Sequence, residues 1–284
     1  MNKKAKNLKV SAPGKIILSG EYAVVYGHPA LLTAVSRRLS ITSEGGKKRL
    51  IDSNIPIGCG MGSSAAYAVA ISALKLKLGG GQWDLEKINK EAYKIEKRRH
   101  GNPSGGDNTI STYGGFLWYR KEAESLKIFS KISPSKNFPK IFFIDTGKPD
   151  ESTKEMVSMV GKYYKNHRKK IERIFVNIEG ITRAFLKLLT GEENASSVEL
   201  LKENEKLLEK LDVVSLFTQF IIRKIEKMGG AAKILGAGGK KLGSGIILCY
   251  HSNPDKLLKF AEKENLDMFN LKLGEKGVRV DGTS

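Results

Sequence analysis

Cysteine is scarce in this 284-residue chain, which contains only Cys59 and Cys249. Two cysteines cannot build the disulfide framework of a small secreted domain. No apolar run approaches the roughly 18–20 residues that span a bilayer. The basic N-terminal stretch MNKKAKNLKVSAPGK also lacks the apolar core of a signal peptide. We therefore expect a cytoplasmic protein without a membrane partner.

Acidic residues are also in short supply, with 30 Asp and Glu against 49 Lys and Arg and a formal net charge of +19. Such a charge suits nucleic acid, an acidic membrane surface or small anionic substrates. The basic residues, however, are spread along the chain and mixed with Glu in segments such as 84–99 and 200–210. We recognise no zinc-finger spacing and no RNP-like motif. We interpret the charge mainly as solvated surface and expect no specific nucleic-acid partner.

The order of the expected elements favours an α+β fold. Residues 8–42 are rich in β-branched side chains and predict strands. Long helical stretches are expected over residues 151–228, and strands and helices alternate after them. The polar segment 120–140 separates these regions and predicts two domains, residues 1–130 and 131–284. Two layers per domain favour α+β over a doubly wound parallel sheet.

The stretch IPIGCGMGSSAAYAVA at residues 55–70 lacks the lysine of a Walker phosphate loop, and Gly62 stands in its place. Glycines still let backbone N–H groups approach an anion, and the helix expected at 63–78 adds the positive end of its dipole. A plain loop capped by a serine is the alternative. If the loop binds nucleotide phosphates, the contacting residues are Gly58, Gly60, Met61, Gly62, Ser63, Ser64 and Ala65.

Two carboxylates and a lysine are candidates for charged groups of a site. Glu96 falls on the apolar stripe of a helix that begins after Asp84. It needs a cation, a metal or a hydrogen-bond network, unless it reaches water at the helix end. Asp107 lies in GNPSGGDN, whose composition predicts an irregular loop, where it could face a ligand or cap a turn. Lys15 follows the SAPG turn, although most lysines are simply exposed. The glycine-rich stretch at 233–245 could line a ligand or form a hairpin.

Taken together, three stretches resemble the ordered motifs of the GHMP kinase superfamily. They are SAPGKIILSGEYAVVYGHPAL, IPIGCGMGSSAA and KILGAGGKKLGSGI. The stretch HGNPSGGDNTISTYGG is similar to that of the mevalonate kinases. The resemblance implies a ribosomal protein S5 domain 2-like N-terminal domain and a ferredoxin-like C-terminal domain. It further implies ATP- and Mg²⁺-dependent phosphorylation of the 5-hydroxyl of (R)-mevalonate, by a homodimer.

The resemblance also implies roles for individual residues. Asp107 matches the catalytic carboxylate and Lys15 matches the lysine beside it. Ser64 and Glu96 match the Mg²⁺ ligands. The residues that match mevalonate contacts are Lys15, Glu21, Tyr22, Tyr67, Asp107, Thr146, Gly236, Ala237 and Gly238.

The chain also departs from the family pattern. Only a short segment separates Thr42 from Pro56, where the family has a longer one that helps to enclose adenine. Lys240 and Lys241 interrupt the last glycine run, and Tyr22 replaces a common histidine. One alternative is another GHMP kinase, acting on phosphomevalonate, a sugar or a heptose phosphate. Another is a basic binding protein that has the fold without catalysis.

Overall fold

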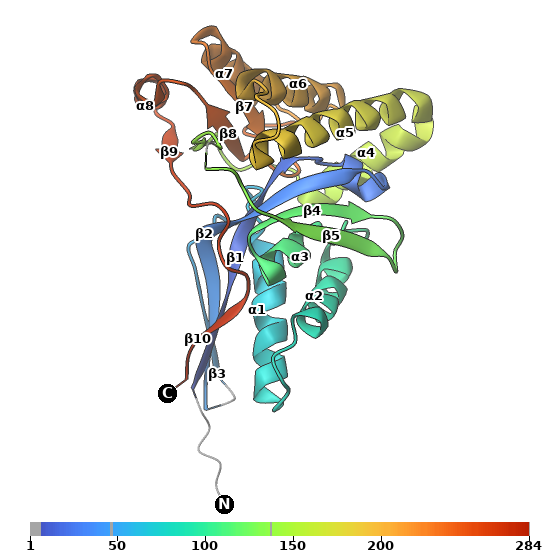
Figure 1. The fold of residues 1–284 in the computed structure, drawn as a ribbon, viewed down its shortest axis with the longest axis vertical. Helices are drawn as coiled ribbons and strands as arrows, with labels where there is room; N and C mark the ends of the chain where they lie inside the picture. Colours follow the sequence, from blue (N-terminus) through green and yellow to red (C-terminus); the bar gives the residue numbers. More distant parts are fainter. Residues whose placement is uncertain (1–6, 46–47, 137, 284) are drawn as a thin grey trace, which may run out of the picture.

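The structure is a computed structural model that describes residues 7–45, 48–136 and 138–283, and its strands form two antiparallel sheets (Figure 1). The first sheet has the order β10-β1-β2-β4-β5, with β3 paired to β2. Its strands are β1 (Leu8–Ser19), β2 (Pro29–Glu44), β3 (Lys48–Ser53), β4 (Phe116–Lys121), β5 (Lys127–Ile132) and β10 (Arg279–Thr283). The second sheet has the order β7-β8-β6-β9. Its strands are β6 (Phe142–Asp145), β7 (Ala231–Ile234), β8 (Ile246–Tyr250) and β9 (Asp267–Phe269).

The helices that pack with the first sheet are α1 (Ser63–Leu78), α2 (Leu85–His100) and α3 (Gly106–Tyr113). Helix α1 packs against β1 and β2 through a buried surface rich in alanine, and α2 and α3 pack against α1. The bounds of α1 confirm the helix expected at 63–78. The carboxylate of Asp84 accepts the N–H of Lys87 at 3.0 Å, which confirms Asp84 as the cap of α2.

The remaining helices belong mostly to the second half of the chain. They are the short 3₁₀ helix η1 (Ala23–Tyr26), then α4 (Thr153–Asn166), α5 (Arg168–Thr190), α6 (Ser197–Lys210), α7 (Leu216–Lys227) and α8 (Pro254–Lys263). Helix α5 has a continuous buried stripe of apolar residues. It packs against α6 and also against β1 and β2 of the first sheet. Helix α5 therefore joins the two halves of the molecule.

The stretch GNPSGGDN is more regular than its composition predicts. Helix α3 already begins at Gly106, so Asp107 lies in its first turn, and the expectation of an irregular loop is wrong at this point. Gly105 has a φ of 89°, and this left-handed turn redirects the chain into the helix. Gly105, one of the glycines that predicted a loop, thus allows α3 to begin at Gly106.

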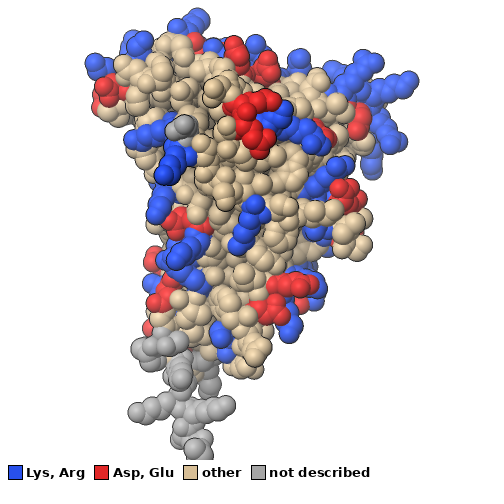
Figure 2. Space-filling model, viewed as in Figure 1, with Lys and Arg blue, Asp and Glu red and all other residues tan. Residues whose placement is uncertain are grey.

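The two sheets establish the expected α+β fold. We propose the division into domains 1–130 and 131–284, although the first sheet also takes in the end of β5 at Ile132 and, through its pairing with β1, strand β10. No described helix is long and apolar enough to cross a bilayer. Figure 2 shows basic side chains dispersed over one face among acidic ones, with a group near the turn between α4 and α5.

Candidate active site

The first contact that builds the site joins the glycine loop at residues 58–62 to strand β1. The backbone N–H of Lys15 donates to the carbonyl oxygen of Met61 at 3.0 Å. Gly62 has a φ of 75°, and a Cβ on it would lie 2.6 Å from Cγ of Lys15. Glycine is therefore the residue that fits at position 62. The loop that leads into α1 lies directly against the side chain of Lys15.

A second contact joins this loop to the glycine loop that follows β7. A Cβ on Gly60 would overlap the carbonyl oxygen of Leu235. A Cβ on Gly236, in turn, would lie 3.1 Å from Cα of Gly60. The two glycine loops, distant in the sequence, thus lie backbone to backbone, and two of the motifs singled out in the sequence form one surface.

Lys15 and Asp107 form an ion pair at this surface. The distance from Nζ of Lys15 to Oδ2 of Asp107 is 3.0 Å. The lysine side chain is 4% exposed and the aspartate side chain 36% exposed, so an accessible carboxylate is paired with a buried cation. The first turn of α3 also favours a negative charge through the helix dipole. The expected proximity of these two residues is confirmed.

Glu96 and Ser64 meet beside the same loop. Oγ of Ser64 donates to Oε1 of Glu96 at 2.6 Å, and Glu96 is only 4% exposed. The expectation that this carboxylate faces inward is therefore confirmed. Burial raises the pKa of Glu96; the Ser64 hydrogen bond and His100 oppose the shift, and the charge of Asp107 adds to it.

The end of α2 brings a guanidinium and an imidazole to Ser64. Nη1 of Arg99 is 3.3 Å and Nε2 of His100 is 3.2 Å from Oγ of Ser64. The guanidinium of Arg99 also lies over the half-buried ring of Tyr67, 4.9 Å from its centroid. Sequence reasoning did not single out Arg99 or His100. Their helical spacing of three and four residues from Glu96 is the signal that could have found them.

The donor set of Ser64 and Glu96 fits a magnesium ion. Mg²⁺ prefers hard oxygen ligands, keeps several waters and completes its shell with substrate phosphates. A buried carboxylate with a raised pKa is also stabilised in its charged form by a nearby cation. Among the described residues, no group of three or more His, Cys, Asp and Glu could hold a metal ion. A magnesium site with few protein ligands therefore fits this surface better than a site in which every ligand comes from the protein.

The segment of Glu21 and Tyr22 faces the second sheet. Glu21 is 1% exposed, and its carboxylate pairs with Lys233, which sequence reasoning did not single out. Tyr22 has a φ of 62°, and its hydroxyl donates to the carbonyl oxygen of Ala237. Burial raises the pKa of Tyr22. The structure thus brings Tyr22 together with Ala237. Oε1 of Glu21 is engaged by Lys233, whereas the buried Oε2 has no hydrogen-bond partner among the described residues.

Thr146 and Gly238 lie behind the second glycine loop. The buried hydroxyl of Thr146 donates to the carbonyl oxygen of Gly245 at 2.6 Å and accepts the N–H of Ser244 at 3.1 Å. A Cβ on Gly238 would overlap the carbonyl oxygen of Val213. Both residues therefore make contacts within the protein that hold this loop in place.

The remaining residues of the first loop differ in what they can offer a ligand. Met61 and Ala65 bury their side chains, so only their backbone can face a phosphate. Ser63 is half-buried at the start of α1. Lys148 was not singled out, yet its side chain lies over Gly58, where a Cβ would be 3.0 Å from Cε of the lysine. Its position just after the apolar strand FFID is the sequence feature that could have identified Lys148.

Comparisons with known proteins agree with this geometry. Residues 25–115 match the family model of the GHMP kinases N terminal domain. The mevalonate kinase of Archaeoglobus fulgidus is 34% identical over 267 residues, covering 81% of this chain and 88% of the relative. The mevalonate kinase of Pyrococcus horikoshii is 28% identical, covering 84% of this chain and 85% of the relative.

Solved structures share the fold over nearly the whole chain. The Lin0012 protein from Listeria innocua aligns with a TM-score of 0.81 and 20% identity, covering 97% of this chain and 100% of that one. The L. major mevalonate kinase in complex with R-mevalonate aligns with a TM-score of 0.77 and 22% identity, over 96% and 98% of the two chains. The matching family model, together with the shared fold, places the chain among the GHMP kinases. Since a relative is 34% identical over most of both chains, the chain belongs to the mevalonate kinase family within that class.

Proposed function

We propose that this protein transfers the terminal phosphoryl group of ATP to the 5-hydroxyl of (R)-mevalonate, giving 5-phosphomevalonate and ADP. The observation that carries the proposal is the 3.0 Å contact between Lys15 and Asp107 beside the glycine loop that opens α1. The mevalonate kinases among the relatives support the choice of substrate.

ATP is the expected phosphoryl donor, and the glycine loop is the expected site for its phosphates. Backbone N–H groups at a helix N-terminus bind anions through direct hydrogen bonds and the helix dipole. Ser64 and Glu96 would hold Mg²⁺, which would neutralise negative charge on the phosphates. The contacting residues would be Gly58, Gly60, Met61, Gly62, Ser63, Ser64 and Ala65.

Asp107 and Lys15 are the proposed catalytic residues. Phosphoryl transfer needs mainly positioning and charge stabilisation, because its transition state is loose. The carboxylate of Asp107 would accept or orient the proton of the attacking hydroxyl. The ammonium of Lys15 would compensate that carboxylate and stabilise charge on the transferred group.

The mevalonate contacts remain predictions that rest on the resemblance. Tyr22, Tyr67, Gly236 and Ala237 lie on or near the surface formed by the two glycine loops. Homodimer formation, a location in the cytoplasm and the expectation of no specific nucleic-acid partner are proposals of the same kind.

A substrate comparison tests the function. The purified protein is assayed with ATP and Mg²⁺ against mevalonate, phosphomevalonate, galactose and a heptose phosphate. This set is necessary because the fold also aligns with a Streptococcus pneumoniae phosphomevalonate kinase and a Lactococcus lactis galactokinase, at TM-scores of 0.72 and 0.73. We expect kcat/KM for mevalonate to exceed the others at least a hundredfold, on the order of the discrimination that a few well-placed polar contacts supply.

Preferred turnover of any other acceptor would overturn the proposed substrate. Salt-sensitive nucleic-acid binding without ATP turnover would favour a binding protein on the same fold.

A further inference from the structure

A buried ion pair lies next to the site, and the phosphoryl-transfer chemistry gives it no role. Lys233 in β7 and Glu21, shortly after β1, contact each other through Nζ and Oε1. Their side chains are 0% and 1% exposed. Taking two charges out of water is costly, and apolar residues of similar size often stabilise a fold equally well. Stability alone therefore does not account for this pair.

Lys233 is also held by its neighbours. Its Nζ donates a second hydrogen bond to the carbonyl oxygen of Ile234 at 2.8 Å. The N–H of Ile234 donates to Oε2 of Glu205 on α6 at 2.9 Å. Burial raises the pKa of Glu205 to about 8, which favours the neutral form of this carboxyl. Glu21 is therefore the direct charge partner of Lys233.

The pair connects the two segments that carry predicted mevalonate contacts. Glu21 directly precedes Tyr22, and Lys233 lies a few residues before Ala237 in the chain. The hydroxyl of Tyr22 donates to the carbonyl oxygen of Ala237, so the same two segments are joined a second time. Tyr22 has a φ of 62°, which is costly for a residue with a side chain and persists only where the surroundings hold it. The ion pair is the adjacent contact that can hold it.

We propose that the ion pair of Lys233 and Glu21 positions the substrate, because it holds segment 20–22 against residues 236–238 and so shapes the mevalonate side of the site. Both are positioning residues, and Glu21 acts through Lys233 without touching mevalonate. The identity of the substrate rests on the proposed function. The contact between segments 20–22 and 236–238, called the segment contact below, is a property of the protein itself.

Steady-state kinetics of Glu21→Gln, Lys233→Met and the double variant test the proposal. We expect each single variant to raise KM for mevalonate at least tenfold and KM for ATP less than twofold, because the phosphate loop keeps its contact with Lys15. We expect the double variant to raise KM for mevalonate less than the product of the two single effects, since it removes both charges together. If Lys233→Met does not accumulate as folded protein, Lys233→Gln, which retains a donor, replaces it.

Two kinetic outcomes would overturn the proposal. If Glu21 binds mevalonate directly, Glu21→Gln raises KM, Lys233→Met leaves it unchanged, and no coupling appears. If the pair serves stability alone, Tm falls in each variant while both KM values stay within twofold of the wild type. Leu189→Ala, a buried position on α5, is the control that lowers Tm without touching either segment.

Hydrogen exchange tests the segment contact independently of activity. The N–H of Val24 donates to the carbonyl oxygen of Gly20 at 3.1 Å and closes the turn that contains Glu21. We expect this amide to exchange at least tenfold faster in both single variants than in the wild type and Leu189→Ala. An unchanged exchange rate would show that the ion pair does not hold the segment contact. If the wild type prefers another phosphoryl acceptor, the proposed function is wrong, and the exchange rates still test whether the ion pair holds the segment contact.

Discussion

At the residue scale, charge compensation between elements organises the site. Lys15 from β1 compensates Asp107 from α3, and Lys233 from β7 compensates Glu21. Charged groups taken out of water are costly unless they are paired or hydrogen-bonded. Each pair therefore specifies how two distant segments meet.

Removing the Asp107 carboxylate should affect chemistry and spare nucleotide binding. We expect Asp107→Ala to lower kcat by about 10²–10⁴-fold, the range typical of a lost general base. ATP affinity, measured by fluorescence titration, should change little because the phosphate loop is untouched. Glu203→Ala, at an exposed position on α6, is the control. Turnover of Asp107→Ala within tenfold of the wild type would contradict the catalytic assignment.

Glu205 should make the free energy of unfolding depend on pH. Its pKa is about 8 in the folded protein because of burial, against about 4.3 for an unperturbed glutamate. Between these values the folded state binds more protons than the unfolded state, so Glu205 lowers stability progressively as pH rises from about 4.3 to about 8. We expect Tm of the wild type to fall more than Tm of Glu205→Gln between pH 5 and pH 9. Parallel Tm curves for the two proteins would refute this.

At the element scale, the glycine loops act as paired surfaces whose backbones touch. Gly60 has a φ of 85° and no room for a Cβ beside Leu235, whereas Gly80, with a φ of 76°, has open space around it. The two positions share the conformational cost of a left-handed backbone. They differ only in the contact between the loops.

Comparing Gly60→Ala with Gly80→Ala isolates this contact. We expect Gly80→Ala to lower the free energy of unfolding by about 1–2 kcal/mol, the cost of a left-handed non-glycine residue, with normal kinetics. Gly60→Ala should lose more stability and raise KM for ATP and mevalonate, because it pushes the two loops apart. Urea denaturation and steady-state assays measure both effects. Equal behaviour of the two variants would show that the loop contact does not matter.

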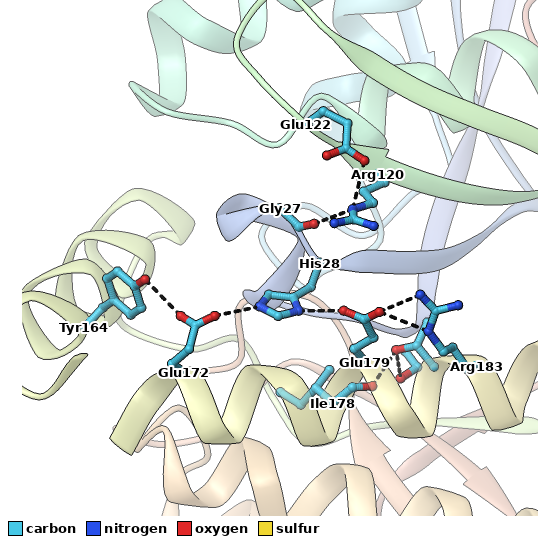
Figure 3. Close-up of polar contacts among 11 residues, drawn as sticks. Gly27, His28, Arg120, Glu122, Tyr164, Glu172, Ile178, Glu179 and Arg183 are labelled. Carbon is cyan, nitrogen blue, oxygen red and sulfur yellow. Dashed lines mark hydrogen bonds and ion pairs between the residues drawn. The ribbon is translucent and has the colours of Figure 1, made fainter. Parts of the chain in front are cut away.

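At the scale of the whole molecule, α5 joins the two sheets. Figure 3 shows the imidazole of His28, just before β2, between two glutamates of α5. Nδ1 of His28 is 2.8 Å from Oε2 of Glu179, and Nε2 is 3.3 Å from Oε1 of Glu172. The hydroxyls of Ser19 and Thr182 make a second buried contact between β1 and α5, at 2.8 Å.

A double-mutant cycle on His28 and Glu179 measures how strongly this contact couples the two parts of the molecule. We expect His28→Ala to lower the free energy of unfolding by about 1–3 kcal/mol, as for a partly buried hydrogen bond to a charged group. The coupling energy with Glu179→Gln should reach at least about 0.5 kcal/mol, measured by urea denaturation. The exposed pair of Lys90 and Glu86 is the control, and its coupling should be smaller because solvent screens an exposed ion pair. Additive effects of the two substitutions would show that His28 and Glu179 are not energetically coupled.

Local patterns in the sequence predicted a large part of the fold. The cap at Asp84, the start of α1 at Ser63 and the inward face of Glu96 all depend on residues within a few positions of each other. Hydrogen bonds of the first helical turn and the helical repeat act over that range. The composition of GNPSGGDN predicted its glycine turn but not the start of α3, because a helix that packs on β1 and β2 is stabilised by those strands.

The residues and their motifs by themselves predicted the α+β class, the family and part of the charged groups of the site, namely Lys15, Glu96 and Asp107. The pairing of Lys15 with Asp107 was expected from the resemblance, whereas the pairing of Lys233 with Glu21 was decided only when segments far apart in the chain came together. The glycine loop at residues 58–62, which has no lysine, is an example: the side chains of Lys15 and Lys148, from other parts of the chain, lie against it. Burial and pairing depend on the whole folded chain, so no local pattern carries them.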